Sequence, residues 1–85
     1  MKATRYFEEQ VMRKRAYLTP EICEQAIRSP LRIDVQSDGR VRYWAQVNLS
    51  GDDKTRILRV ITLDDGETVH NAFLDRGYRE EDEER

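Results

Sequence analysis

The chain has few of the residues that build disulfides and metal sites. Its 85 residues include one cysteine, one histidine and two prolines. An internal disulfide is therefore excluded, and no cysteine–histidine cluster has the spacing of a metal site, so we expect no cofactor and no metal. No apolar run approaches the roughly 20 residues of a membrane helix, and the polar N-terminus lacks the apolar core of a signal peptide. These absences predict a cytoplasmic protein that does not bind membranes.

Charge is abundant but unevenly distributed along the chain. Hydrophobic and charged residues each make up 38%, which is typical of one soluble domain with a thin core. Residues 1–60 carry 12 basic and 8 acidic residues, whereas residues 61–85 carry 3 and 9. We therefore predict a single, mildly basic domain over residues 1–78 and a disordered acidic tail over residues 79–85.

Two short helices are predicted in the first third of the chain. Residues 4–14 place Phe7 and Val11 four apart, with acidic residues early and basic residues late, an order that suits the helix dipole. Thr19 followed by Pro20 predicts a second helix start, because threonine caps free amides and proline fits the first turn. A Ser-Pro pair ends this helix after little more than two turns, so it must pack against the sheet to be stable.

Two turns of the same kind follow, Ser37-Asp38-Gly39 and Asp64-Asp65-Gly66. Each lies between runs of alternating apolar and polar residues, and a three-residue hairpin loop favours glycine last because that position is left-handed. The predicted strands cover residues 31–36, 40–47, 56–63 and 67–74. Around the first turn the predicted pairs are Val35–Val41, Ile33–Tyr43, Leu31–Ala45, Asp34–Arg42 and Arg32–Trp44. Around the second turn they are Ile61–Val69, Ile57–Phe73, Thr62–Thr68 and Leu58–Ala72.

The predicted fold is an α+β domain with two N-terminal helices packed on one face of a four-stranded antiparallel sheet. On the last two strands, one set of alternate residues carries no full charge, and we expect this set in the core. It contains Leu58, Val60, Thr62, Thr68, His70, Ala72 and Leu74. The opposite face is expected to be open and to present Arg32, Asp34, Arg42, Trp44, Ile57, Arg59, Ile61, Val69, Asn71 and Phe73.

Several short segments give the chain a resemblance to a known family. They are Arg13-Lys14-Arg15, Tyr17-Leu18-Thr19-Pro20-Glu21, Pro30, Arg40-Val41-Arg42-Tyr43 and Leu58-Arg59-Val60-Ile61. Together with two short helices leading into an antiparallel sheet, they cover about residues 3–78. Over this length the chain resembles the RelE/ParE superfamily of bacterial toxins. It is most similar to the small BrnT-like members and to related bacterial domains of unknown function.

The resemblance implies a toxin that cleaves messenger RNA and is held by an antitoxin protein. Such a site needs cations on the scissile phosphate and a group that handles the 2′-hydroxyl proton. Carried onto this sequence, the resemblance implies catalytic roles for Arg42, Arg59, Arg76 and Tyr78. His70 is the reserve acid–base candidate, because it is the only histidine of the chain.

Several of the candidates also have a structural interpretation. Trp44 and Arg32 are predicted RNA-binding residues, since a tryptophan ring stacks on bases. The same ring also suits a cover over the apolar part of the sheet, with Arg32 lying on it. Arg42 also suits an ion pair with Asp34 across the hairpin, and His70 suits a hydrogen bond at the edge of the core.

Three classes of function are therefore open. The first is an RNA-cleaving toxin of a toxin–antitoxin pair. The second is a non-catalytic protein-binding module of the same fold, because many ParE relatives have no ribonuclease activity. The third is a nucleic-acid binder without chemistry, whose affinity would be sensitive to salt. An open sheet edge on so small a domain also predicts association with another chain, including a second copy of this one.

Overall fold

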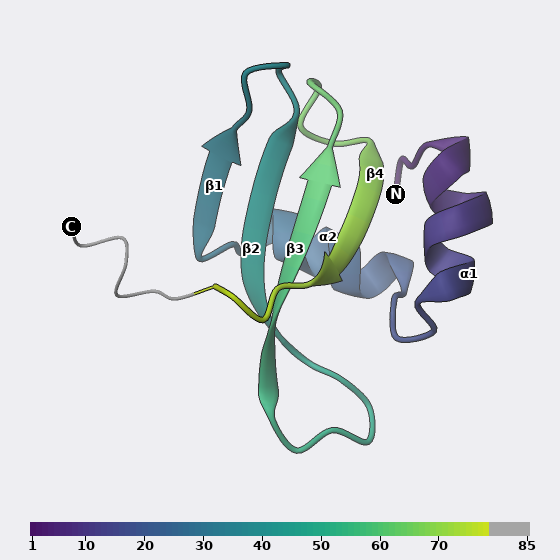
Figure 1. The fold of residues 1–85 in the computed structure, drawn as a ribbon, viewed down its shortest axis with the longest axis vertical. Coiled ribbons are helices and arrows are strands. Elements are labelled where there is room, and N and C mark those ends of the chain that lie inside the picture. The colour runs from purple at the N-terminus through teal and green to yellow at the C-terminus, as the bar shows by residue number, and fades with distance from the viewer. Residues whose placement is uncertain (79–85) are drawn as a thin grey trace.

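The computed structural model describes residues 1–78 and shows short helical segments followed by a four-stranded antiparallel sheet (Figure 1). This arrangement confirms the predicted α+β class and the order of the elements. The sheet order is β1-β2-β3-β4, so β1 and β4 are its two edges. The predicted acidic tail, residues 79–85, lies outside the described residues. The elements are η1 Phe7–Val11, α1 Met12–Lys14, α2 Pro20–Arg28, β1 Arg32–Val35, β2 Val41–Asn48, β3 Thr55–Thr62 and β4 Val69–Leu74.

The N-terminal helix is amphipathic and continuous from η1 into α1. At its start the Thr4 hydroxyl accepts a hydrogen bond from the Phe7 amide (3.1 Å). The Met12 amide donates to the Phe7 carbonyl, which is the wide turn of a π-helix. Phe7 and Val11 are buried on one side. The prediction of a helix near residues 4–14 is confirmed, and η1 contacts β4.

The second helix, α2, begins and ends where the sequence predicts. The Thr19 hydroxyl accepts from the Ile22 amide (3.1 Å), which satisfies one of the free amides of the first turn. Cys23 and Ala26 are buried on the side that faces the protein. Figure 1 shows α2 behind the sheet, and it contacts β2 and β3. Burial of this face supplies the stability that so short a helix lacks alone.

The first hairpin has the predicted register. Gly39 has a φ of +91°, as the last position of the loop requires. The Gln36 amide donates to the Arg40 carbonyl (2.7 Å) and closes the three-residue loop. The pairs Arg32–Trp44, Ile33–Tyr43, Asp34–Arg42 and Val35–Val41 are all confirmed. The predicted pair Leu31–Ala45 is not formed in this ladder, since β1 begins at Arg32 and the Leu31 amide donates to the Trp44 carbonyl instead (2.7 Å).

The predicted register of the second hairpin is wrong. The Leu63 amide donates to the Thr68 carbonyl (2.9 Å), so the loop spans residues 64–67 and is one residue longer than predicted. The Asp65 carboxylate stabilises this wider loop by accepting from the Glu67 and Thr68 amides, both at 2.9 Å. The observed pairs are Thr62–Val69, Ile61–Asn71, Val60–Ala72, Arg59–Phe73 and Leu58–Leu74, with a register shift between Ile61 and Thr62.

The shift places His70 as an extra residue on β4, which is the pattern of a β-bulge. On the side of the bulge near the turn, Val69 lies opposite the buried Thr62, so Val69 is buried in the core and not on the open face as predicted. Beyond the bulge, Asn71 lies opposite Ile61 as its place on the open face requires. The bulge therefore corrects the predicted positions of both Val69 and His70.

The core lies on the predicted uncharged face of the sheet. Burial raises the pKa of the Cys23 thiol to about 11, so this cysteine is a protonated, apolar core residue. The buried hydrophobic residues form one cluster: Phe7, Val11, Leu18, Cys23, Ala26, Tyr43, Ala45, Val47, Leu58, Val60, Val69 and Ala72. Within residues 1–78, no helix has the length and apolar character needed to cross a bilayer.

Candidate functional site

The face of the sheet opposite this core carries a cluster of arginines around one tryptophan. Direct cross-strand pairs place Arg32 beside Trp44 and Trp44 beside Arg59, while Arg42 precedes Trp44 by two residues on β2. Residues at these positions share one side of a pleated sheet. We call Arg32, Arg42, Trp44, Arg59 and Asp75 the arginine–tryptophan cluster. The prediction that the arginines and the tryptophan share one face is confirmed.

Trp44 is enclosed by its neighbours. Only 6% of its surface is exposed, although it lies on the face without the helix-packed core. The guanidinium carbons of Arg32, Arg42 and Arg59 lie 5.4, 5.4 and 5.3 Å from the centre of its ring, which is the distance range of cation–π contact. The ring of Tyr78 stacks beside it at 6.0 Å between centroids. This geometry matches the structural interpretation of Trp44 as a cover over the sheet.

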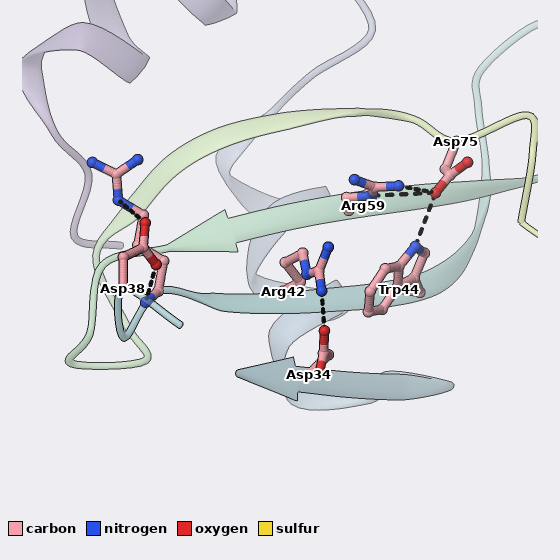
Figure 2. A network of polar contacts seen from close by, with 7 residues as sticks. Asp34, Asp38, Arg42, Trp44, Arg59 and Asp75 are labelled. Carbon is pink, nitrogen blue, oxygen red and sulfur yellow. Dashed lines mark hydrogen bonds and ion pairs between the residues drawn. The ribbon is translucent and has the colours of Figure 1, made fainter. Parts of the chain in front are cut away.

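Asp75 connects Trp44 on β2 with Arg59 on β3, and it was not identified from the sequence. Its Oδ2 accepts hydrogen bonds from Trp44 Nε1 (2.9 Å) and from the Nη2 and Nε atoms of Arg59 (2.7 and 3.2 Å). Figure 2 shows both side chains pointing toward this carboxylate. Burial alone would raise the pKa of Asp75. The hydrogen bonds from Arg59 and Trp44 and the charge of Arg59 outweigh burial, and the pKa lies below its ordinary value.

Arg42 has its own acidic partner on the edge strand. Its Nη2 donates to Asp34 Oδ2, and Figure 2 shows this pair between β2 and β1. The predicted ion pair across the first hairpin is therefore present. The Nε atom of Arg42 is buried and has no hydrogen-bond partner among the described residues. The charge of Arg42 is therefore engaged by Asp34 and the Trp44 ring within the cluster.

The two predicted catalytic arginines do not converge on one position. Arg42 bonds to Asp34 at the β1 side, whereas Arg59 bonds to Asp75 after β4. A phosphate held by both guanidinium groups would have to compete with both carboxylates. Each arginine therefore has a structural role in the described residues: it covers Trp44 and neutralises one aspartate.

The remaining candidates lie in different surroundings. Tyr78 folds back over the open face as predicted, and its ring contacts Trp44. Arg76 is exposed and lines a shallow hollow of about 340 Å³ beside Tyr78, Asp75 and Ile57. Its lining combines two basic side chains, Arg56 and Arg76, with the acidic Asp75 and apolar residues. Arg56 is already paired with Asp52 (2.7 Å).

His70 lies away from the arginine–tryptophan cluster. Its Nδ1 is 3.0 Å from the Thr4 hydroxyl, and its ring lies 5.0 Å from the ring of Tyr6. The pKa of His70 lies below the ordinary histidine value. Burial is the larger cause of this shift, and the positive charge of Arg40 is the smaller one. His70 is therefore the hydrogen-bonded residue at the core edge that the structural interpretation describes, and it is not placed to move a proton near Arg42 or Arg59.

The two edges of the sheet differ in how they are covered. At β4, the Val69 amide donates to the Lys2 carbonyl and the Thr4 amide donates to the Val69 carbonyl, both at 2.9 Å. Farther along, the Leu74 amide donates to the Tyr17 hydroxyl (3.2 Å). The chain therefore closes this edge with its own N-terminal segment and the helix connection.

The β1 edge has no such cover among residues 1–78. Three of its residues are exposed apolar side chains: Ile33 is 56% exposed, Val35 is 65% exposed, and Leu31 just before the strand is also exposed. Ile33 and Val35 share the side of the sheet that carries the core, since they lie opposite Tyr43 and Val41. An exposed edge strand with an apolar row is the feature of a sheet that pairs with another chain. In the sequence, the alternation of Leu31, Ile33 and Val35 is the signal that could have identified this edge.

Comparison with known proteins adds no assignment. No family model, no curated protein and no solved structure matches this chain. Residues 1–78 also contain no group of three histidine, cysteine or acidic side chains arranged to hold a metal ion. Two surfaces of residues 1–78 are candidates for function, the arginine–tryptophan cluster and the β1 edge.

Proposed function

We propose that the chain is a non-catalytic protein-binding domain that receives an extended polypeptide segment along its β1 edge. The observation that carries the proposal is the exposed apolar residues on an edge strand whose outer side has no neighbouring strand among residues 1–78, while the chain itself covers the other edge. An added strand gains affinity from main-chain hydrogen bonds and specificity from alternate side chains. The edge suits a short segment with apolar residues at every second position.

The arginine–tryptophan cluster supports a structural role for the residues that a ribonuclease would use. Arg42 and Arg59 are each bonded to a carboxylate, and Trp44 is buried beneath arginines. A base would have to displace these side chains to stack on Trp44. The RelE/ParE-like fold, with both helices on one sheet face, and the messenger-RNA-cleaving toxin remain the alternative proposal. In that alternative the segment at the β1 edge belongs to an antitoxin.

Backbone amide hydrogen exchange tests the proposed binding edge. The amides of Ile33 and Val35 should exchange fast in the isolated, dilute chain and slow at least about tenfold when a strand is added, since they gain hydrogen bonds. The chain is to be measured alone and with any protein encoded beside it. The matched control is the amide of Leu74, which is already bonded to Tyr17 and should not change.

Expression in a host without the neighbouring gene separates the two proposals. A non-catalytic domain predicts normal growth and intact RNA after incubation with purified protein. Growth arrest that disappears in a folded Arg42→Ala, Arg59→Ala double variant would contradict the binding proposal and favour the toxin. Thermal unfolding of the double variant supplies the control, because both arginines also pack on Trp44.

A further inference from the structure

The hydrogen-bond pattern of the first hairpin shows which backbone groups of β1 point outward. Gln36 and Arg40 form a bonded pair, and bonded and non-bonded pairs alternate along an antiparallel ladder. Asp34 and Arg32 therefore bond toward β2. The amide and carbonyl groups of Ile33 and Val35 point away from the sheet, where no strand of residues 1–78 lies.

We propose that the occupant of this edge is a second copy of the same chain, paired antiparallel through β1 about a two-fold axis at Ile33. This inference rests on the proposed function and names its partner. In this register Ile33 faces the Ile33 of the second copy and exchanges both backbone hydrogen bonds with it. Val35 lies beside the segment of the second copy that precedes β1, where the Leu31 amide is bonded inward to the Trp44 carbonyl. The two sheets then form one continuous sheet, and the exposed Ile33 and Val35 side chains of each copy pack against those of the other.

Charge complementarity selects this register. With Ile33 on the axis, Arg32 faces the partner's Asp34 and Asp34 faces the partner's Arg32. Each dimer then has two opposite-charge pairs on the open face, which add to the contacts of Asp34 with Arg42 and of Arg32 with Trp44. A shift by two residues in one direction sets Asp34 against Asp34. The same shift in the other direction sets Arg32 against Arg32. A like-charge pair directly across two strands is destabilising, and a shift by one residue would place apolar side chains against charged ones.

The edge strand is thus self-complementary in three respects: outward hydrogen-bonding groups at alternate residues, an apolar row on one side and an alternating Arg–Asp pair on the other. A closed two-fold contact uses the same surface on both partners, as this strand does. The β1 edge of both copies is buried in the dimer, so the association ends at two copies and does not extend into fibres.

Charge reversal tests the proposal with a rescue built in. The parent chain should show a concentration-dependent monomer–dimer equilibrium in sedimentation or light scattering. Arg32→Asp alone and Asp34→Arg alone should each weaken dimerisation by about tenfold or more, because each creates two like-charge pairs per dimer. An equimolar mixture of the two variants should dimerise again, since one chain then presents two carboxylates and the other two guanidinium groups.

Folding controls keep the result interpretable. Both variants should keep the circular dichroism spectrum of the parent. If either unfolds, because Arg32 lies on Trp44 or Asp34 bonds to Arg42, Ile33→Lys replaces it. This change affects an exposed side chain and sets two ammonium groups against each other on the axis. It should give a folded monomer.

Two results would overturn the proposal: a parent chain that stays monomeric at every concentration, or a variant mixture that stays monomeric while the parent dimerises. The proposed function is judged separately. If the chain is a monomer but the Ile33 and Val35 amides become protected when the neighbour-encoded protein is added, the edge binds a different partner and only the self-pairing is wrong. If those amides never become protected, both proposals are wrong.

Discussion

Replacing Trp44 with alanine is expected to lower the free energy of unfolding by about 3–5 kcal/mol, the range for truncating a buried tryptophan. The ring is 6% exposed and is covered by three arginines and Tyr78. A domain of this length has a total stability of about 4–13 kcal/mol. The variant should therefore lose between about a quarter and all of the total stability, measured as a lower midpoint of urea denaturation followed by circular dichroism.

Trp44→Phe is the matched control for this prediction. It keeps most of the ring that the arginines cover but removes the Nε1 donor to Asp75. We expect a loss of about 1 kcal/mol for the hydrogen bond, plus a smaller packing loss. If Trp44→Ala were as stable as Trp44→Phe, the ring would not be part of the folded structure's packing. Trp44 would then be free to act as a ligand-stacking residue.

Asp75→Ala is expected to lower the free energy of unfolding by about 3 kcal/mol. Breaking a buried ion pair costs about 3–5 kcal/mol because the remaining charge loses its partner, and the 26% exposure of Arg59 places this pair at the low end. Trp44 Nε1 loses its acceptor in the same variant. Glu9→Ala removes the exposed pair with Arg5 and should cost less than about 0.5 kcal/mol.

The contribution of Asp75 should also depend on pH. Its pKa is lowered in the folded protein from the ordinary 3.8. Its stabilising effect is therefore present above about pH 4 and is lost as the pH falls through the folded-state pKa. The difference in stability between the parent and Asp75→Ala should be constant from pH 7 to about pH 5 and shrink in more acidic solution. A difference that stays constant down to pH 2 would contradict the charged role of Asp75.

The start of α2 and the first hairpin could be predicted because residues close by in the sequence determine them. The cap at Thr19 and the left-handed Gly39 are decided by nearby residues, and both the start of α2 and the first hairpin were predicted correctly. The second turn looks the same in sequence but is held wider by the Asp65 carboxylate. Its strand is also bonded to Lys2, far away in the chain. Neither effect is visible in the alternation of apolar residues.

Arg32, Arg42, Trp44 and Arg59 were predicted members of the candidate site, but Asp75 and the contacts between the members were not. Beyond the bulge the register error on β4 is two residues, an even number, so Phe73 and Asn71 still lie on the predicted face. Asp75 follows the last alternating residue and takes its place only because its amide donates to the Ile57 carbonyl (2.8 Å). That tertiary contact brings a carboxylate to Arg59 and converts a predicted phosphate ligand into half of an ion pair.

Disulfide trapping tests the central claim, that β1 is a self-pairing edge, most directly. In the proposed register the two Ile33 Cα atoms form a hydrogen-bonded pair about 5.5 Å apart, which a disulfide spans. The two Val35 residues lie about 14 Å apart, which a disulfide does not span. Val35 is the more exposed of the two side chains, so random collision would favour it. The native Cys23 is buried and stays unreactive in both variants.

Mild oxidation of the Ile33→Cys variant should therefore give a covalent dimer, seen on a non-reducing gel, much faster than oxidation of the Val35→Cys variant. Equal or faster cross-linking of Val35→Cys alone, or no cross-linking of Ile33→Cys, would contradict the account.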